Sequence, residues 1–454
     1  MSGVLDAVLS PLAELMPGTR RVRVAVTGLA RAGKTALLAS TAANLLALGA
    51  GLPALPLLSQ HLGQRRMTVT LAPAGAEDLP RFDHAAHVAA LAADPPRWPE
   101  RTQAVSVLAL DLAVERRTML GEMLGSKRIR LELLDYPGEW LLDLPLLAEA
   151  FSTWSEATLA RLERGPAGPV RDFLAFARGL PANAAADEAL AASGHALYRT
   201  ALARLRDEAR LSLLQPGRFL MPPPGPEPPW MGFFPLPGSS PLSRLLAARF
   251  DAYRDAVRRD LMEGRFAAVD RVLVLADVLA ALAAGPAAFA DMQAALAAAS
   301  SALRYDTSFL RTIPLLDRLL PPRIGRAVFA ATKADHVAAR QRGNLAALIA
   351  ALVRLPADAP QPVSLAVAAV RATEDFVWTL DGRNVSAVRG RVLGEGRLTR
   401  SYPGEVPDHP PDAMFWAHPF LEVPVFEPMR PLPGGAIPQL GLDALLVALL
   451  GDVL

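Results

Sequence analysis

The chain has 454 residues, of which 52% are hydrophobic and 20% charged, so we expect a large folded core rather than a disordered chain. It contains no cysteine, which excludes disulfides, thiolate metal sites and cysteine catalysis and is typical of a cytoplasmic protein. The net charge is only +2, and no tract interleaves basic with aromatic residues, so no nucleic-acid partner is expected.

The first predicted element is an N-terminal helix over 4–15, within the segment 1–20. This segment lacks the basic and apolar regions of a signal peptide. Further along, the stretch 36–60 carries no charge, but glycines and prolines interrupt it, which favours a helix buried against a sheet over a membrane span. We therefore expect no membrane span, while peripheral contact with the inner membrane stays open.

A glycine-rich loop connects a predicted strand, 21–27, to a predicted helix, 36–48. Its sequence follows the pattern G-x-x-x-x-G-K-T, from Gly28 to Thr35, in the setting that this pattern requires. Glycines at both ends let backbone N–H groups surround a phosphate, and the helix directs its positive end at the same anion. The residues expected to contact the nucleotide are Gly28, Arg31, Ala32, Gly33, Lys34, Thr35 and Ala36. Lys34 is expected to reach the β- and γ-phosphates and act in catalysis, and Thr35 to bind Mg²⁺.

Lysine usage supports this interpretation. Among 47 basic residues only three are lysines, namely Lys34, Lys127 and Lys333. Two of them fall in nucleotide-binding patterns, which random placement would seldom produce. Because the planar guanidinium of arginine cannot replace a compact ammonium group, we infer that lysine is retained where its chemistry is needed.

The segment 52–99 is rich in proline and predicted to be irregular, apart from a strand at 67–71. GTPases place their first switch loop at such an excursion. Thr102, just before the strand 105–114, is the candidate for a second Mg²⁺ ligand and a catalytic role, although an ordinary threonine preceding a strand is an equal alternative. Nucleotide contacts are expected from Trp98, Arg101, Thr102 and Gln103.

A second switch pattern, D-x-x-G, follows the predicted strand 129–134. Asp135 is expected to hold Mg²⁺ through water, and the N–H of Gly138 to contact the γ-phosphate. Glu139 stands where many GTPases carry a glutamine that orients the attacking water. Two interpretations stay open for Glu139, a catalytic position beside the water or a carboxylate that caps the following helix.

Residues 146–265 are predicted to form a helical insertion in which nothing resembles a catalytic group. Helical periodicity covers 151–177, 187–214 and 242–262. The intervening segment 221–241 combines prolines with aromatic residues, which favours a strap packed across the domain over a ligand for a partner.

The sheet resumes with strands at 269–276 and 327–331, separated by predicted helices at 287–303 and 308–320. The second strand leads into Thr332-Lys333-Ala334-Asp335, in which the carboxylate can accept both N1–H and N2–H of guanine. Contacts with the base are expected from Thr332, Lys333, Asp335 and His336, and from the backbone of Ala369 and Val370 after a last strand, 363–370. An ordinary buried strand end is an equal alternative for Ala369 and Val370. The tail from 381 is predicted to be rich in loops and to close with a helix over 441–450.

Taken together, these motifs resemble the YcjX-like family of stress-associated P-loop GTPases of bacteria. The resemblance is carried by five stretches, Thr27–Thr35, Leu134–Pro145, Gln215–Phe219, Phe329–His336 and Tyr402–Pro407. It implies a GTPase-type domain with an added helical domain, the cofactors Mg²⁺ and GTP/GDP, and a link to envelope or phage-shock stress. The protein partner, which the resemblance does not identify, would then belong to the envelope-stress proteins.

We therefore predict an α/β fold of the P-loop NTPase (GTPase) type, with a mixed, mostly parallel sheet whose second strand is antiparallel and with a helical insertion domain. The expected divisions are 1–20, 21–145 (phosphate loop and switches), 146–265 (insertion), 266–380 (guanine recognition) and 381–454. The predicted function is slow, Mg²⁺-dependent hydrolysis of GTP by a nucleotide-controlled switch. The alternatives are a nucleotide-gated scaffold without useful turnover and an ATPase of the same fold.

Overall fold

The computed structural model describes residues 19–72, 80–100, 105–116, 125–223, 225–262, 269–302, 324–355, 361–380, 382–418 and 420–454. Three predictions lie outside these described residues: the N-terminal helix 4–15, the helix 308–320 and the first-switch residues Arg101, Thr102 and Gln103. They stay predictions.

Seven strands of the described chain form one sheet in the order β2-β3-β4-β1-β5-β6-β7. Their bounds are β1 (Thr19–Gly28), β2 (Met67–Leu71), β3 (Ser106–Val114), β4 (Lys127–Asp135), β5 (Arg271–Ala276), β6 (Arg326–Ala331) and β7 (Val363–Ala366). All neighbours pair in parallel except at β3, which is antiparallel to both β2 and β4. The predicted mixed, mostly parallel sheet is therefore confirmed, but its antiparallel strand is the third along the chain and not the second.

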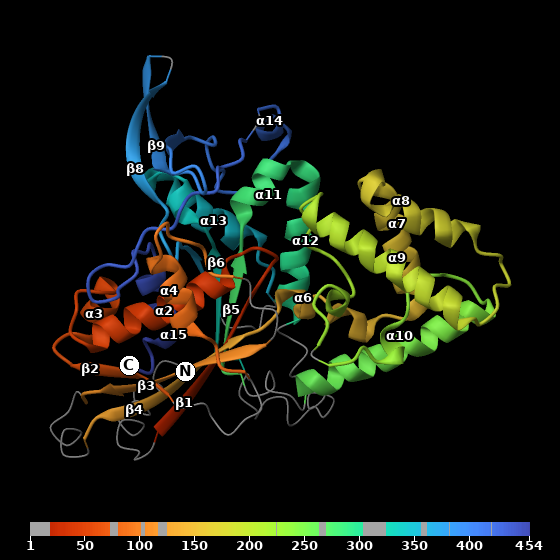
Figure 1. Ribbon diagram of the computed structural model, residues 1–454, viewed down its shortest axis with the longest axis horizontal. Coiled ribbons are helices and arrows are strands. Elements are labelled where there is room, and N and C mark those ends of the chain that lie inside the picture. The colour runs from red at the N-terminus through yellow and green to blue at the C-terminus, as the bar shows by residue number, and fades with distance from the viewer. Residues whose placement is uncertain are drawn as a thin grey trace.

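Helices cover both faces of the sheet (Figure 1). One core contains α2 (Lys34–Gly49), α3 (Pro56–Leu62) and α15 (Leu442–Leu450), and the other contains α11 (Val278–Ala284), α12 (Pro286–Ala302) and α13 (Arg342–Leu352). Strand β5 serves both cores, because Val272 and Val274 face one and Leu273 and Leu275 the other. A strand covered on both faces needs apolar residues at successive positions, which explains the buried apolar run of β5 from Val272 to Ala276.

The helical insertion follows the short helix α6 (Gly138–Leu141) and stands beside the sheet domain (Figure 1). It consists of α7 (Phe151–Arg164), α8 (Ala167–Gly179), α9 (Glu188–Asp207) and α10 (Pro241–Met262). Its core is aromatic, with Trp154 stacked on Phe250 at 5.1 Å between ring centroids. Phe233 and Phe234 of the segment 221–241 are fully buried in this core, so that segment is a packed strap.

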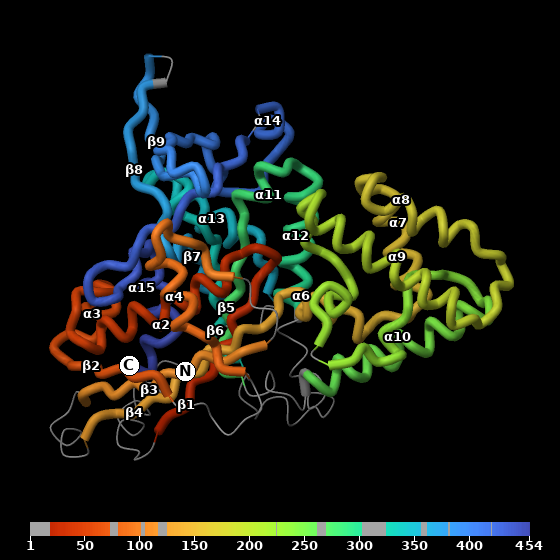
Figure 2. The backbone as a smooth tube through the Cα atoms, in the orientation of Figure 1, coloured from red at the N-terminus to blue at the C-terminus, as the bar shows by residue number. Residues whose placement is uncertain are grey.

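Several elements differ from the sequence-based expectations. The segment 52–99 contains two helices, α3 and α4 (His84–Ala92), where irregular structure was expected. A second, antiparallel sheet pairs β8 (Thr373–Leu380) with two strands of the tail, β9 (Arg383–Arg391) and β10 (Leu398–Ser401). The tail also contains α14 (Ala413–Trp416). The β8–β9 hairpin projects from the body (Figure 2), so the expected boundary at 380/381 falls in its turn. Most of the described tail beyond β10 lies outside helices and strands, and it closes with α15.

The C-terminal segment holds the sheet and the site together. Arg271 of β5 is buried and donates to both carboxylate oxygens of Asp452, at 2.6 and 2.8 Å. Ala368, just after β7, exchanges two backbone hydrogen bonds of 2.8 Å with Leu440. The loop that leaves β7 is therefore fixed by residues near the end of the chain.

Candidate functional site

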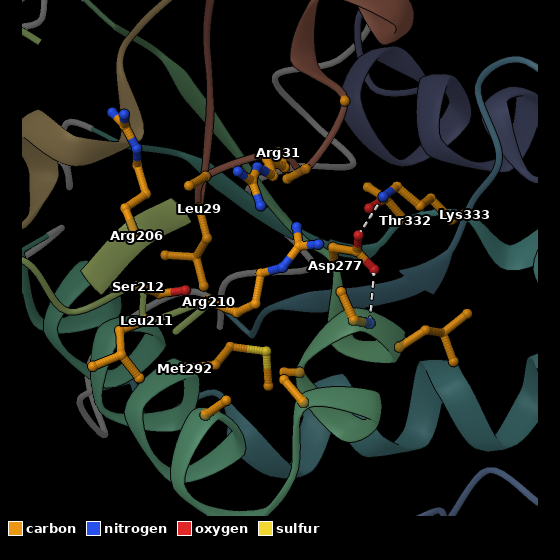
Figure 3. Close-up of a pocket in the computed structure, with 18 of the residues that line it drawn as sticks. Leu29, Arg31, Arg206, Arg210, Leu211, Ser212, Asp277, Met292, Thr332 and Lys333 are labelled. Carbon is orange, nitrogen blue, oxygen red and sulfur yellow. Dashed lines mark hydrogen bonds and ion pairs between the residues drawn. The ribbon is translucent and has the colours of Figure 1, made fainter. Parts of the chain in front are cut away.

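A cavity of about 1210 Å³ opens at the carboxyl ends of the parallel strands. Segments that leave five strands line it: the phosphate loop after β1, Asp135 after β4, Asp277 after β5, 332–336 after β6 and 367–370 after β7. Ligands of open α/β sheets bind at this edge, because the loops that leave adjacent parallel strands meet there. Figure 3 shows Arg31, Asp277, Thr332 and Lys333 around the cavity.

The phosphate loop has the backbone shape that its glycines predict. Arg31 (φ 63°) and Gly33 (φ 82°) are left-handed, and the N–H of Leu29 donates to the carbonyl of Leu275 at 2.9 Å. Gly28 is needed for this close approach, because an added Cβ would lie 2.5 Å from the Leu275 carbonyl oxygen. Helix α2 has no side-chain cap and no acidic residue in its first turn, so the positive end of the helix faces the cavity without a neighbouring carboxylate from that turn.

Lys34 and Thr35 begin α2 and both line the cavity. The Nζ of Lys34 lies 3.4 Å from the carbonyl oxygen of Gly28, so the side chain folds back over the loop. This places the ammonium group beside the backbone that would surround a phosphate.

The oxygen donors for a Mg²⁺ ion come from two elements. Thr35 supplies a hydroxyl from α2, and Asp135 supplies a buried carboxylate at the end of β4. No group of three or more acidic or histidine side chains suited to a metal occurs among the described residues. A hydroxyl and one carboxylate fit Mg²⁺, which completes its shell with water and phosphate oxygens. Thr102, the other predicted ligand, lies outside the described chain.

The D-x-x-G segment packs directly on the phosphate loop. A Cβ added to Gly138 would lie 1.7 Å from the carbonyl oxygen of Gly28, so only glycine permits this contact. Glu139 is 7% exposed, lies in the first turn of α6 and lines the cavity. This position is compatible with both interpretations of Glu139.

The segment after α6 is joined to the insertion by buried polar contacts. Asp143 is completely buried and accepts hydrogen bonds from the N–H of Gly217 (2.6 Å) and from the Tyr253 hydroxyl (2.6 Å). Burial raises the pKa of Asp143 to about 6, against the attraction of Arg218. The Arg218 guanidinium covers the Trp140 ring at 4.8 Å, so the second switch and the insertion share one polar core.

The T-K-A-D segment forms the opposite end of the cavity. The buried Asp335 carboxylate accepts from the N–H of Ala372 at 2.7 Å, which fixes its orientation. Lys333 (φ 58°) forms an ion pair of 2.5 Å with Asp277, which also caps α11 through the N–H of Ala280. Burial lowers the pKa of His336, so its imidazole is neutral at pH 7.

Two further predicted segments reach the cavity. Ala369 and Val370 line it after β7, and the Ala369 carbonyl accepts from the Ser40 hydroxyl. Trp98 also lines it, with Nε1 donating to the carbonyl of Phe426 at 2.8 Å. The Ala369 carbonyl is therefore fixed by α2.

The structure thus brings most predicted site residues to one cavity. Those that line it are Arg31, Ala32, Gly33, Lys34, Thr35, Ala36, Trp98, Asp135, Glu139, Thr332, Lys333, Asp335, His336, Ala369 and Val370. Gly28 lies behind the loop, against Leu275, and Gly138 lines a smaller adjoining cavity.

Sequence reasoning missed several residues of this cavity. For Asp277 the sequence did contain an indication, because an acidic residue stands directly after a predicted buried strand. Arg206 and Arg210 come from the insertion and had none, since they lie in a stretch with many arginines. Asp207 beside them accepts from the guanidinium of Arg31 at 3.0 Å.

A mixed α/β sheet with a glycine-rich phosphate loop between β1 and α2 defines the class of P-loop nucleotide-binding proteins, of the GTPase type. Residues 22–454 match the YcjX-like family, DUF463. The chain is 35% identical to the "Ras-like GTPase YcjX" of Escherichia coli (strain K12), with 96% of each chain covered. It is 31% identical to the "Ras-like GTPase YcjX" of Shewanella oneidensis, with 87% of this chain and 86% of the relative covered. The chain belongs to the YcjX-like family.

No helix in the described part of the chain is long and apolar enough to cross a membrane.

Proposed function

We propose that the protein is a Mg²⁺-dependent GTPase that slowly hydrolyses GTP to GDP and phosphate and works as a nucleotide-controlled switch. The observation that carries this proposal is one cavity with a phosphate-binding loop at one end and the buried Asp335 at the other. The names of the two relatives support GTP as the nucleotide.

Each end of the cavity has a chemical role. The α2 N-terminus, Lys34 and the loop amides bind the phosphates, and Thr35 and Asp135 would hold Mg²⁺. When bound, Mg²⁺ neutralises charge on the β- and γ-phosphates. Asp335 accepts N1–H and N2–H of guanine, which favours GTP over ATP because adenine lacks this pair of donors.

Slow turnover follows from Glu139. An ionised carboxylate can only accept hydrogen bonds, whereas glutamine can donate to one partner while it accepts from water. The carboxylate also brings negative charge toward a γ-phosphate. A scaffold that binds GTP or GDP without useful turnover is therefore the second candidate.

The remaining assignments rest on the family resemblance alone. We place the protein in the cytoplasm, with peripheral contact at the inner membrane, and its partner among envelope-stress proteins. The switch loops would adopt different conformations with GTP and with GDP, and this difference would control the contact with the partner.

The experiment that tests the function compares binding of GTP and ATP with their single-turnover hydrolysis. We expect tight binding of GTP, slow release of phosphate and much weaker binding of ATP. Lys34→Ala, which removes the loop ammonium group, should abolish tight binding. Undiminished GTP affinity in Lys34→Ala would overturn the phosphate-site assignment, and binding without phosphate release would favour the scaffold.

A further inference from the structure

The last turn of α9 brings the insertion to the phosphate loop. Asp207, the final residue of α9, accepts a 3.0 Å hydrogen bond from Arg31 of that loop. Asp207 also accepts from Nε and Nη2 of its neighbour Arg206, at 3.0 and 2.9 Å. A single carboxylate therefore holds two guanidinium groups, one from each domain.

Arg206 is placed next to the second switch. Its side chain is only 17% exposed. It lines the large cavity and also a smaller adjoining cavity, which it shares with Ala30, Gly138 and Glu139. The hydrogen bond to Asp207 raises the pKa of Arg206, and the charge of Glu139 acts in the same direction. The guanidinium of Arg206 thus lies in the field of Glu139.

Arg210 is the other insertion arginine in this region, and its setting is different. It is 45% exposed, lies 3.6 Å from Glu422 in an ion pair, and does not line the smaller cavity. In Figure 3 the side chains of Arg206 and Arg210 extend in different directions, with Arg210 toward Asp277. Arg206 is therefore the insertion arginine that neighbours Gly138.

We propose that Arg206 is a catalytic residue, supplied by the helical insertion, that contacts the γ-phosphate during GTP hydrolysis. This inference rests on the proposed function. In the reaction the water oxygen bonds to the γ-phosphorus while the bond to the bridging oxygen breaks; that electron pair leaves with GDP and the water proton passes to the phosphate. Negative charge spreads over the reacting oxygens, and a guanidinium fork stabilises it.

The positive charge of Arg206 also offsets the repulsion that the Glu139 carboxylate would exert on the γ-phosphate. A carboxylate close to the γ-phosphate raises the barrier by repulsion, and a neighbouring guanidinium offsets that charge. Asp207 is the positioning residue in this scheme, since it fixes the guanidinium plane of Arg206 and ties it to the phosphate loop through Arg31.

The test uses the full-length protein and the variants Arg206→Ala, Arg206→Lys and Arg204→Ala. Arg204 is the matched control, because it lies on the same helix but pairs with Glu208 and does not line either cavity. Single-turnover hydrolysis, the Kd for GTP, and binding of GDP with aluminium fluoride are measured. We expect Arg206→Ala to lower the rate by about 100-fold or more. Its Kd for GTP should change by less than about threefold, because the lost contact belongs to the transition state.

Binding of GDP with aluminium fluoride, which imitates the transferred phosphoryl group, should be lost in Arg206→Ala. Arg206→Lys should recover only part of the rate, because an ammonium group keeps the charge without the fork. Arg204→Ala should match the parent. A normal hydrolysis rate in Arg206→Ala, or normal binding of the fluoride complex, would overturn the inference, whereas a parent that does not bind or hydrolyse GTP would instead refute the proposed function.

Discussion

The orientation of the Asp335 carboxylate is set by neighbouring backbone groups. Its Oδ2 is committed to the N–H of Ala372, and its backbone carbonyl accepts from the Thr373 hydroxyl. The side chain is therefore held in one orientation before any base binds, which lowers the entropy lost on binding. The sequence motif indicates the residue, but only the structure shows what orients it.

The substitution Asp335→Asn should change the nucleotide preference of the protein from GTP to XTP. The N–H of Ala372 needs an acceptor, so the amide oxygen will face Ala372 and the NH₂ group will face the base. That group repels N2–H of guanine but donates to the corresponding oxygen of xanthine, so GTP binding should weaken by about 2–3 kcal/mol. Competition binding of GTP, XTP and ATP measures this, and an unchanged order of affinities would show that the base is not read here.

Glu139→Gln should raise the single-turnover rate of GTP hydrolysis, because the amide can donate and carries no charge. An increase of about tenfold is expected, equivalent to about 1.4 kcal/mol of barrier. Glu139→Ala is the control, since it removes the charge without supplying a donor. Equal rates in all three proteins would leave Glu139 as a helix cap, and a rise shared by both variants would assign the whole effect to charge.

At the scale of elements, α6 is held between the phosphate loop and the insertion. Gly138 touches Gly28, and a Cβ added to Gly217 would lie 1.8 Å from the carbonyl oxygen of Glu139. The buried Asp143 then joins α6 to Gly217 and Tyr253. A displacement of α6 by a γ-phosphate would therefore move the insertion as well, because packed contacts of this kind do not stretch.

Asp143→Asn should change the pH dependence of stability. The pKa of Asp143 is about 6 in the folded protein and near 3.8 when exposed, so its contribution to the free energy of unfolding is present at low pH and is lost as pH rises through about 6. The parent should lose about 1 kcal/mol more than the variant between about pH 5 and about pH 7.5. Urea unfolding of both proteins measures this, and parallel pH profiles would contradict it.

The elements that sequence predicts best are those whose burial is uniform or strictly periodic. The strand β5 and the helix α15 are examples, since both are mostly apolar and mostly buried. The helices α3 and α4 were missed because prolines and short length hide their periodicity. The small sheet β8–β10 was missed because its strands follow a motif-bearing segment and are only half buried.

At the scale of the molecule, sequence predicts the motif segments that line the two ends of the cavity but not the residues that the insertion contributes to it. Motif spacing is local, so Lys34, Asp135 and Asp335 could be found from residues beside them. The contact between Arg31 and Asp207 spans 176 positions and arises only from the packing of α9 against the sheet domain. No pattern in either segment indicates it.

The ion pair of Arg271 with Asp452 connects the middle of the sheet to the end of the chain. Asp452→Ala should leave the buried Arg271 guanidinium without its bidentate partner and lower the free energy of unfolding by about 2 kcal/mol, less than for a fully buried pair because Asp452 is partly exposed. Chemical unfolding measures this, with Asp408→Ala as an exposed control expected to match the parent. Equal stability of all three proteins would show that the pair adds nothing.

The same C-terminal anchor has a consequence for refolding. The pair of Arg271 with Asp452 joins positions that are 181 residues apart. Contacts between distant positions form late, because the entropy of closing a long loop is lost before the contact is gained. We therefore expect the loop after β7, which Leu440 holds at Ala368, to become ordered late in refolding.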